Sequence, residues 1–348
     1  MTSCRRILSA GTSISLAWRL IESKGLNTGM ACLRKGSDML TIGLAVFIML
    51  VNTAVAESAP KAAIPQLSKI TVVNLQIDAE FTQKGHEEKE REETEFLKKI
   101  IAELKKRGIK ATIFVTADFA NTNPHLLKDL FKEGFEIALH GHSTGEQLVT
   151  MTKEAQKDLL GRAKAAVEGC AECGSLLPVL GFRPQNFSQN ADTYAIHAEL
   201  GIKYNCGFKM GQISLPGHEN AVRPYRDQSD SFWIVPMSTF SYKGNPKCLC
   251  DISVKEELIG EEWKEVLFLK IDEAVERGEP LVLSIHGWLI GNEKDYDFWR
   301  PFLAFLDYAQ SKKINFGSTK ELIEIYARGK IEDLRKGKEP GAIPQYKY

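Results

Sequence analysis

Short apolar runs alternate with longer amphipathic segments along most of this chain, and this alternation restricts the fold more than any other feature. The apolar runs have the length of strands and lie at residues 69–78, 110–116, 135–140, 177–184, 203–208, 232–238 and 280–286. The segments with apolar residues at helical spacing lie at residues 87–110, 123–134, 152–170, 190–201, 261–278 and 298–313. Apolar strands that alternate with helices indicate a parallel sheet covered on both faces.

The alternation also favours one domain over two. About seven strand-and-helix units occupy roughly 260 residues, which suits a single closed or nearly closed barrel. We therefore expect an α/β fold, a single distorted (β/α) barrel of about seven parallel strands. Because the chemistry of such barrels occurs at the C-terminal ends of the strands, the polar residues at those ends are the candidates for a site.

The N-terminal segment has the pattern of a secretory signal. Residues 40–51 form an apolar run that is shorter than the about 20 residues of a membrane span. Basic residues at 34 and 35 precede this run, and the sequence Ala-Val-Ala at 54–56 follows it as a cleavage site, so the mature chain is expected to begin at Glu57. A signal that began at Met1 would be unusually long, and the true start is expected at Met30.

These features give an expected domain organisation. A signal sequence spans 1–56, a linker rich in proline and alanine spans 57–68, the barrel domain spans 69–330, and a charged tail spans 331–348. The alternative to a cleaved signal is an uncleaved anchor, which would be the only membrane contact. Either way the protein is expected to be secreted, periplasmic or on the cell surface.

The 45 basic and 45 acidic residues balance, so the chain has no overall basic field that would indicate a nucleic-acid partner.

Five cysteines follow the expected cleavage point, at positions 170, 173, 206, 248 and 250. An exported chain favours disulfides, and the odd number leaves one thiol over. The C-x-x-C spacing of Cys170 and Cys173 leaves a zinc site completed by Cys248 and Cys250 as the alternative.

Ionisable side chains gather where the expected strands end. They are Asp78 and Glu80 at the end of the first strand, His140 and His142 at the end of the third, Arg183 with Pro184 at the end of the fourth, and His286 at the end of the run at 280–286. These side chains are expected to converge at one mouth of the barrel. The other histidines, His86, His125, His197 and His218, are expected on the surface.

In the order and spacing of these residues, the chain from Lys69 to Tyr326 resembles the NodB-homology polysaccharide deacetylases. The resemblance rests on the acidic pair after the first strand and on the stretches "KATIFVTADF", "GFEIALHGHS", "GFRP" and "LSIH". It implies a metal-dependent removal of N-acetyl groups, or of O-acetyl groups, from a cell-wall or extracellular glycan. The implied cofactor is a divalent cation such as zinc, cobalt or nickel.

The residue types suit this chemistry. A cation polarises the acetyl carbonyl and lowers the pKa of the attacking water, a carboxylate accepts the water's proton, and a histidine protonates the departing amine. The resemblance makes Asp78 the general base and His286 the general acid, with Arg183 orienting the base. It makes Glu80 and His140 metal ligands. Pro184 and Trp288 are candidates for binding the sugar, although Trp288 suits the core equally well.

The chain departs from the family pattern at two positions. The common first motif has adjacent aspartates, whereas this chain reads "QIDAEF", with Ala79 in place of the second. In one register of the alignment with that motif, Asp78 is the base. In the other register Asp78 is the metal ligand, and Gln76 falls at the base position, where it would abolish ordinary catalysis.

The second departure concerns the second metal histidine. That position is Thr144, so His142, or more remotely Glu146, would have to replace the ligand. For His142 alone, a hydrogen-bonded turn residue is the alternative interpretation. Two functions therefore remain open, a deacetylase with a modified metal site and a catalytically impaired relative that binds glycan without hydrolysing it.

Overall fold

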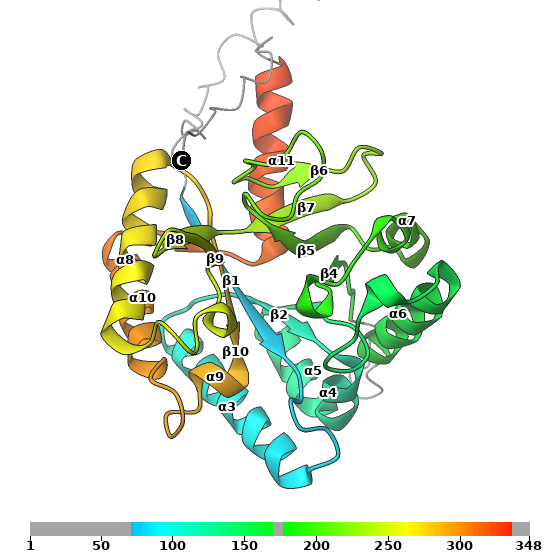
Figure 1. The fold of residues 1–348 in the computed structure, drawn as a ribbon, viewed down its shortest axis with the longest axis horizontal. Helices are drawn as coiled ribbons and strands as arrows, with labels where there is room; N and C mark the ends of the chain where they lie inside the picture. Colours follow the sequence, from blue (N-terminus) through cyan, green and yellow to red (C-terminus); the bar gives the residue numbers. More distant parts are fainter. Residues whose placement is uncertain (1–70, 170–176, 336–348) are drawn as a thin grey trace, which may run out of the picture. The chain divides into compact units, whose positions relative to one another are not determined.

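A curled, mostly parallel sheet organises the computed structural model, which describes residues 71–169 and 177–335 (Figure 1). The strands are hydrogen-bonded in the order β10-β1-β2-β3-β4-β5-β7-β6, and β11 pairs with the start of β1. Every pair is parallel except β6 with β7. This arrangement confirms the predicted α/β fold and its distorted (β/α) barrel.

The strands of this sheet are β1 (Val72–Ala79), β2 (Thr112–Val115), β3 (Glu136–Leu139), β4 (Gly181–Phe182), β5 (Tyr204–Lys209), β6 (Tyr225–Arg226), β7 (Trp233–Met237), β10 (Leu281–His286) and β11 (Asn315–Phe316). A separate antiparallel hairpin joins β8 (Thr239–Tyr242) to β9 (Asn245–Cys248). Each strand-like run in the sequence forms a strand, although β4 is only two residues long.

The helices are α3 (Glu87–Lys106), α4 (Ala117–Thr122), α5 (Pro124–Lys132), α6 (Lys153–Glu168), α7 (Ala191–Leu200), α8 (Gly260–Arg277), α9 (Gly287–Ile290), α10 (Trp299–Ser311) and α11 (Thr319–Arg335). Within the described residues, short 3-10 turns are η2 (Leu148–Thr150), η3 (Gln185–Phe187) and η4 (Asp251–Ser253). Helix α11 continues past residue 330, where the charged tail was expected to begin.

Helix α3 shows why the sequence pattern predicts the packing. Its residues Leu97, Ile100, Ile101 and Leu104 are all buried, as their helical spacing indicates. Acidic residues occupy its first turn and basic residues its last, which suits the helix dipole. The chain turns at Gly108 with a φ of +64°, a conformation that glycine adopts at little cost.

The segment after the β8–β9 hairpin lies between β7 and β10. Leu249 donates its N–H to Ser238 just after β7 (2.8 Å), and Ser284 of β10 donates its N–H to Leu249 (3.2 Å). Cys250 forms an isolated parallel bridge with Ser284. The chain then continues directly into η4, and this path brings Asp251 beside the end of β10.

Two expectations from the sequence need correction. His197 is not on the surface: it is fully buried, because α7 directs it between the rings of Phe182 and Phe232, and Asn205 Nδ2 lies 2.8 Å from its Nε2. Cys206, Cys248 and Cys250 are buried free thiols, so the expected disulfide joins no two of them.

Several predictions about the chain ends fall outside the described residues. These are the signal sequence at 1–56, the linker at 57–68, most of the charged tail, and the pair Cys170 and Cys173. Within the described residues, no helix combines the length and the apolar character that crossing a membrane requires.

Candidate active site

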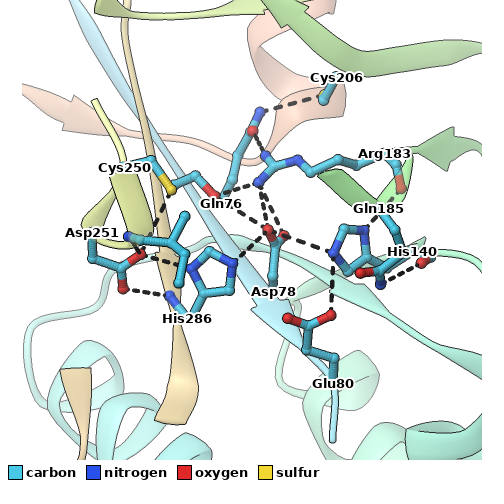
Figure 2. A network of polar contacts seen from close by, with 12 residues as sticks. Gln76, Asp78, Glu80, His140, Arg183, Gln185, Cys206, Cys250, Asp251 and His286 are labelled. Atoms are coloured by element: carbon cyan, nitrogen blue, oxygen red, sulfur yellow. Dashed lines mark hydrogen bonds and ion pairs between the residues drawn. The ribbon is translucent and has the colours of Figure 1, made fainter. Parts of the chain in front are cut away.

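Five of the predicted residues converge at the C-terminal ends of the strands (Figure 2). Asp78 lies at the end of β1 and Glu80 follows it, His140 follows β3, Arg183 follows β4, and His286 ends β10. Each is buried, and none is more than 8% exposed. The parallel sheet therefore brings together side chains that lie up to 208 residues apart in the sequence, as predicted.

Asp78 is paired with Arg183. Arg183 Nη1 lies 3.0 Å from both carboxylate oxygens of Asp78, and its guanidinium lies over the ring of Phe114. Burial alone would raise the pKa of Asp78, but Arg183 and the nearby His140 and His286 lower it below its usual value. The carboxylate is therefore ionised at neutral pH and can accept a proton.

His140 has one ring nitrogen free for a ligand. Its Nδ1 lies 2.8 Å from the backbone oxygen of Arg183, which can only accept a hydrogen bond, so the proton resides on Nδ1. The other ring nitrogen, Nε2, faces Asp78 Oδ2 at 3.7 Å and Glu80 Oε2 at 3.8 Å. Gln185 Nε2 donates to the backbone oxygen of His140 (2.9 Å) and fixes the turn.

The residues at this position fit a divalent cation. Glu80 Oε2 is buried without a hydrogen-bond partner, and an orphaned carboxylate oxygen is costly unless a ligand satisfies it. It lies 3.8 Å from His140 Nε2, and a cation between the two would bind both groups. An imidazole nitrogen with a carboxylate oxygen is a donor set that zinc, cobalt and nickel accept.

His286 is held by Asp251, a residue that the sequence interpretation missed. His286 Nδ1 lies 2.7 Å from Asp251 Oδ1, and its backbone N–H donates to Asp251 Oδ2 (2.7 Å). Burial lowers the pKa of His286, but the charge and the hydrogen bond of Asp251 raise it well above its usual value. The imidazole is therefore protonated at neutral pH, and its Nε2 lies 3.6 Å from Asp78 Oδ2.

Cys250, Asp251 and His286 also form a group of potential metal ligands with donor atoms within 4.8 Å of one another. However, the Asp251 and His286 donor atoms are only 2.7 Å apart, which is a hydrogen-bond distance. Two ligands of one tetrahedral zinc ion would lie roughly 3.4 Å apart. The geometry therefore favours a hydrogen-bonded pair over a metal site at these residues.

The structure does not bring His142 to the other candidate ligands. His142 Nδ1 lies 3.2 Å from Ser143 Oγ and 3.8 Å from Asp118 Oδ1. Thr144 is exposed, and the Glu146 carboxylate accepts the backbone N–H groups of His142 and Ser143. The contacts of His142 and Glu146 therefore lie in the turn itself, and the role of His142 as a metal ligand stays a prediction.

The two predicted sugar-binding residues lie near the site in different ways. The ring of Trp288 meets the ring of His286 edge to face at 6.0 Å, and it also packs against Tyr296. Pro184 is buried beside Gly207, where an added Cβ would lie 2.5 Å from Pro184 Cδ. Trp288 is the better placed of the two to meet a substrate.

Comparisons with known proteins identify a family segment and a fold. Residues 84–205 match the family model described as polysaccharide deacetylase, a segment that contains His140 and Arg183. No curated protein matches the chain. A putative polysaccharide deacetylase from Mycobacterium smegmatis has a similar structure, with a TM-score of 0.59 and 16% identity over 83% of this chain and 99% of that one.

Two further structures share the fold at 16% identity. A probable polysaccharide deacetylase from Pseudomonas aeruginosa PAO1 has a TM-score of 0.60 over 78% of this chain and 95% of that one. The allantoinase Puue has a TM-score of 0.59 over 78% of this chain and 94% of that one. At this identity the structural likeness establishes the fold, and it does not distinguish the substrates of these proteins.

Proposed function

We propose that this chain, whose residues 84–205 match the polysaccharide deacetylase family and whose fold is that of NodB-like deacetylases, is a secreted metal-dependent polysaccharide deacetylase. It hydrolyses N-acetyl or O-acetyl groups of a cell-wall or extracellular glycan. The observation that carries the proposal is the position of Asp78. This ionised carboxylate lies between Nε2 of His140 at 3.7 Å and Nε2 of His286 at 3.6 Å.

The side chains have distinct tasks in this reaction. When bound by Glu80 and His140, a divalent cation supplies Lewis acidity to the acetyl carbonyl and to the attacking water. Asp78 accepts the proton of that water. His286 donates the proton at Nε2 to the departing amine nitrogen as the carbon–nitrogen bond breaks. The proton on Asp78 can then return to His286, because the two side chains are 3.6 Å apart.

The contacts of Asp78 support the register in which it is the base. Both of its oxygens accept hydrogen bonds from Arg183, whereas Glu80 Oε2 has no hydrogen-bond partner and faces His140. The oxygens of Asp78 thus already have a cationic partner, whereas the buried Glu80 Oε2 gains its missing partner by binding the cation. Gln76, which the other register places at the base position, has no group that accepts a proton at neutral pH.

A measurement of metal content together with acetate release tests the proposal. The purified chain should contain a divalent cation and release acetate from chitin oligosaccharides or peptidoglycan. The matched control is His286→Ala, which should retain the metal and lose turnover, because its proposed task is to protonate the amine. A chain without metal, without acetate release and without a rise in Tm on addition of zinc, cobalt or nickel would contradict the proposal.

A glycan-binding protein without hydrolytic activity is the second candidate. It is favoured by the loss of the second metal histidine, since Thr144 is exposed and His142 contacts Asp118 and Ser143. A metal centre with too few ligands binds its cation weakly and loses most of its rate. Binding of chitin oligosaccharides without acetate release, at saturating zinc, would support this candidate.

A further inference from the structure

Gln76 makes direct contact with the arginine that holds the proposed base. It lies on β1 two residues before Asp78, so that both side chains point to the same face of the sheet. Gln76 is fully buried, and its Oε1 accepts a hydrogen bond from Arg183 Nη2 (Figure 2). The resemblance to the deacetylases gives Gln76 no role in the register in which Asp78 is the base, so this contact needs its own explanation.

The pairing of Arg183 with Asp78 does not by itself fix the guanidinium. A two-point pairing uses two nitrogens for two oxygens, whereas here the single atom Nη1 contacts both oxygens of Asp78. Arg183 Nε is buried and has no partner. Nη1 also donates to Ser284 Oγ. The rotation of the guanidinium about Nη1 is therefore limited by the contact of Nη2 with Gln76 and by the ring of Phe114.

The amide of Gln76 is itself fixed in one orientation. Its Nε2 donates to Asn74 Oδ1 (2.7 Å) and lies 3.3 Å from Thr319 Oγ1 and 3.4 Å from Cys206 Sγ. A flipped amide would direct its NH₂ group at the guanidinium, which has only donors. The oxygen of Gln76 therefore has to face Arg183.

The start of helix α11 anchors this arrangement from the opposite end of the strands. Thr319, the first residue of α11, donates through Oγ1 to Asn74 Oδ1 (3.2 Å) and through its N–H to Thr112 Oγ1 (2.7 Å). Asn74 Nδ2 in turn donates to the backbone oxygen of Gly317 (3.0 Å). A continuous row of buried polar groups thus runs from the start of α11 to Arg183.

We propose that Gln76 is a positioning residue, which holds Arg183 through Nη2 so that Nη1 stays on Asp78 in the geometry that the reaction needs. This inference rests on the proposed function, because it assigns Asp78 the role of base. A displaced Arg183 would leave the metal ligands in place and misorient the carboxylate. Loss of Gln76 should therefore affect the chemical step more than substrate or metal binding.

The test compares Gln76→Met with Gln156→Leu. Methionine keeps the length of the side chain and removes both amide groups. Gln156 is an equally buried glutamine on α6 whose amide contacts Leu148, Met151, Asn190 and Thr193 and neither Asp78 nor Arg183. It therefore reports the effect of losing a buried amide alone.

We expect Gln76→Met to lower kcat for acetate release by about 10- to 100-fold, with KM and bound metal within about twofold of the wild type. Gln156→Leu should lower Tm while kcat stays within about twofold. Equal kcat values for wild type and Gln76→Met would overturn the proposal, as would an equal loss of kcat in both variants. If Gln76→Met does not fold, Gln76→Asn is measured in its place, because its side chain is one methylene shorter and draws the amide back from Arg183.

Crystal structures separate this proposal from a failure of the proposed function. If the wild type releases no acetate, the deacetylase assignment fails, but the position of Arg183 can still be measured. In Gln76→Met the guanidinium should rotate and lose at least one of its contacts with Asp78. An unchanged pairing in that variant would show that Gln76 does not position Arg183.

Discussion

Asp78 is only 4% exposed, so water does little to stabilise its negative charge. Neighbouring positive charges keep it ionised instead. Arg183, His140 and His286 outweigh the effect of burial on its pKa. The same three residues come from three different strands, so the state of the base depends on the whole mouth of the barrel. The role of Asp78 can be tested separately from that of Glu80, because the same chemical change is possible at both positions.

Asp78→Asn keeps the shape of the side chain and removes the proton acceptor. If Asp78 is the base, turnover should fall by roughly 100-fold or more while the bound metal is retained. Glu80→Gln is the matched variant, and it should lose metal and activity together because Glu80 Oε2 faces His140 Nε2. Metal analysis and acetate release measure the two effects. Loss of metal in Asp78→Asn would instead favour the register in which Asp78 is a ligand.

Asp251→Asn should change the pH range in which the enzyme works. Asp251 raises the pKa of His286, so its neutral replacement lowers that pKa. Since His286 has to be protonated to act as the acid, the alkaline limb of kcat/KM should move to lower pH. Asp158→Asn, at an exposed residue paired with Arg162, should leave the profile unchanged. An unmoved alkaline limb in Asp251→Asn would show that Asp251 does not control the proton donor.

At the scale of elements, strands and helices with a strong pattern were predictable and short irregular segments were not. Helix α3 follows its apolar spacing, and the apolar run at 280–286 becomes β10. The hairpin of β8 and β9 has four-residue strands, exposed positions and a proline in β9, so it shows no clear period. That hairpin leads to Asp251, which explains why the sequence interpretation missed this residue.

The two-residue strand β4 depends on a glycine that lets β5 come close. A Cβ built on Gly181 would lie 1.9 Å from Tyr204 Cζ, and the Tyr204 hydroxyl is fixed by its hydrogen bond to Glu136 (2.8 Å). The tyrosine is buried and cannot move aside without losing this bond. Residue 181 therefore has to be glycine for the strand pairing that places Arg183.

Gly181→Ala should lower the free energy of unfolding by roughly 1–3 kcal/mol or more, because the added methyl group overpacks the pair of strands. Gly161→Ala is the control. There the added Cβ meets only Leu200 Cδ2 at 3.6 Å inside helix α6, so the change should stabilise the protein by about 0.5–1 kcal/mol. Urea unfolding measures both variants, and equal stabilities would contradict the proposed steric role of Gly181.

At the scale of the whole molecule, the sequence predicted which residues meet but not how they are held. Asp78, His140, Arg183 and His286 could be expected at one mouth because they end parallel strands. Their supports come from distant segments whose contacts have no local pattern. Asp251 is 35 residues from His286, and Thr319 is 243 residues from Gln76. Only the folded chain shows these pairs.

His197 makes the stability of the fold depend on pH. Its pKa is lowered to about 3, mainly because burial disfavours the charged ring, and its Nε2 already accepts a hydrogen bond from Asn205. In the unfolded chain the histidine returns to its ordinary value of 6.5. Below pH 6.5 the unfolded state therefore binds more protons than the folded state, and the stability from this residue is lost as the pH falls toward 3.

Between pH 6.5 and pH 4 this effect should lower the free energy of unfolding by roughly 3 kcal/mol. His197→Gln removes the titrating group, so its stability should fall less steeply over this range than that of the wild type. His86→Gln, at an exposed histidine, is the control and should keep the wild-type slope. Urea unfolding at several pH values gives the slopes. The slope reports the difference in bound protons between the unfolded and folded states, whatever the absolute stability of the variant. Identical slopes for the wild type and His197→Gln would therefore mean that other groups govern acid unfolding.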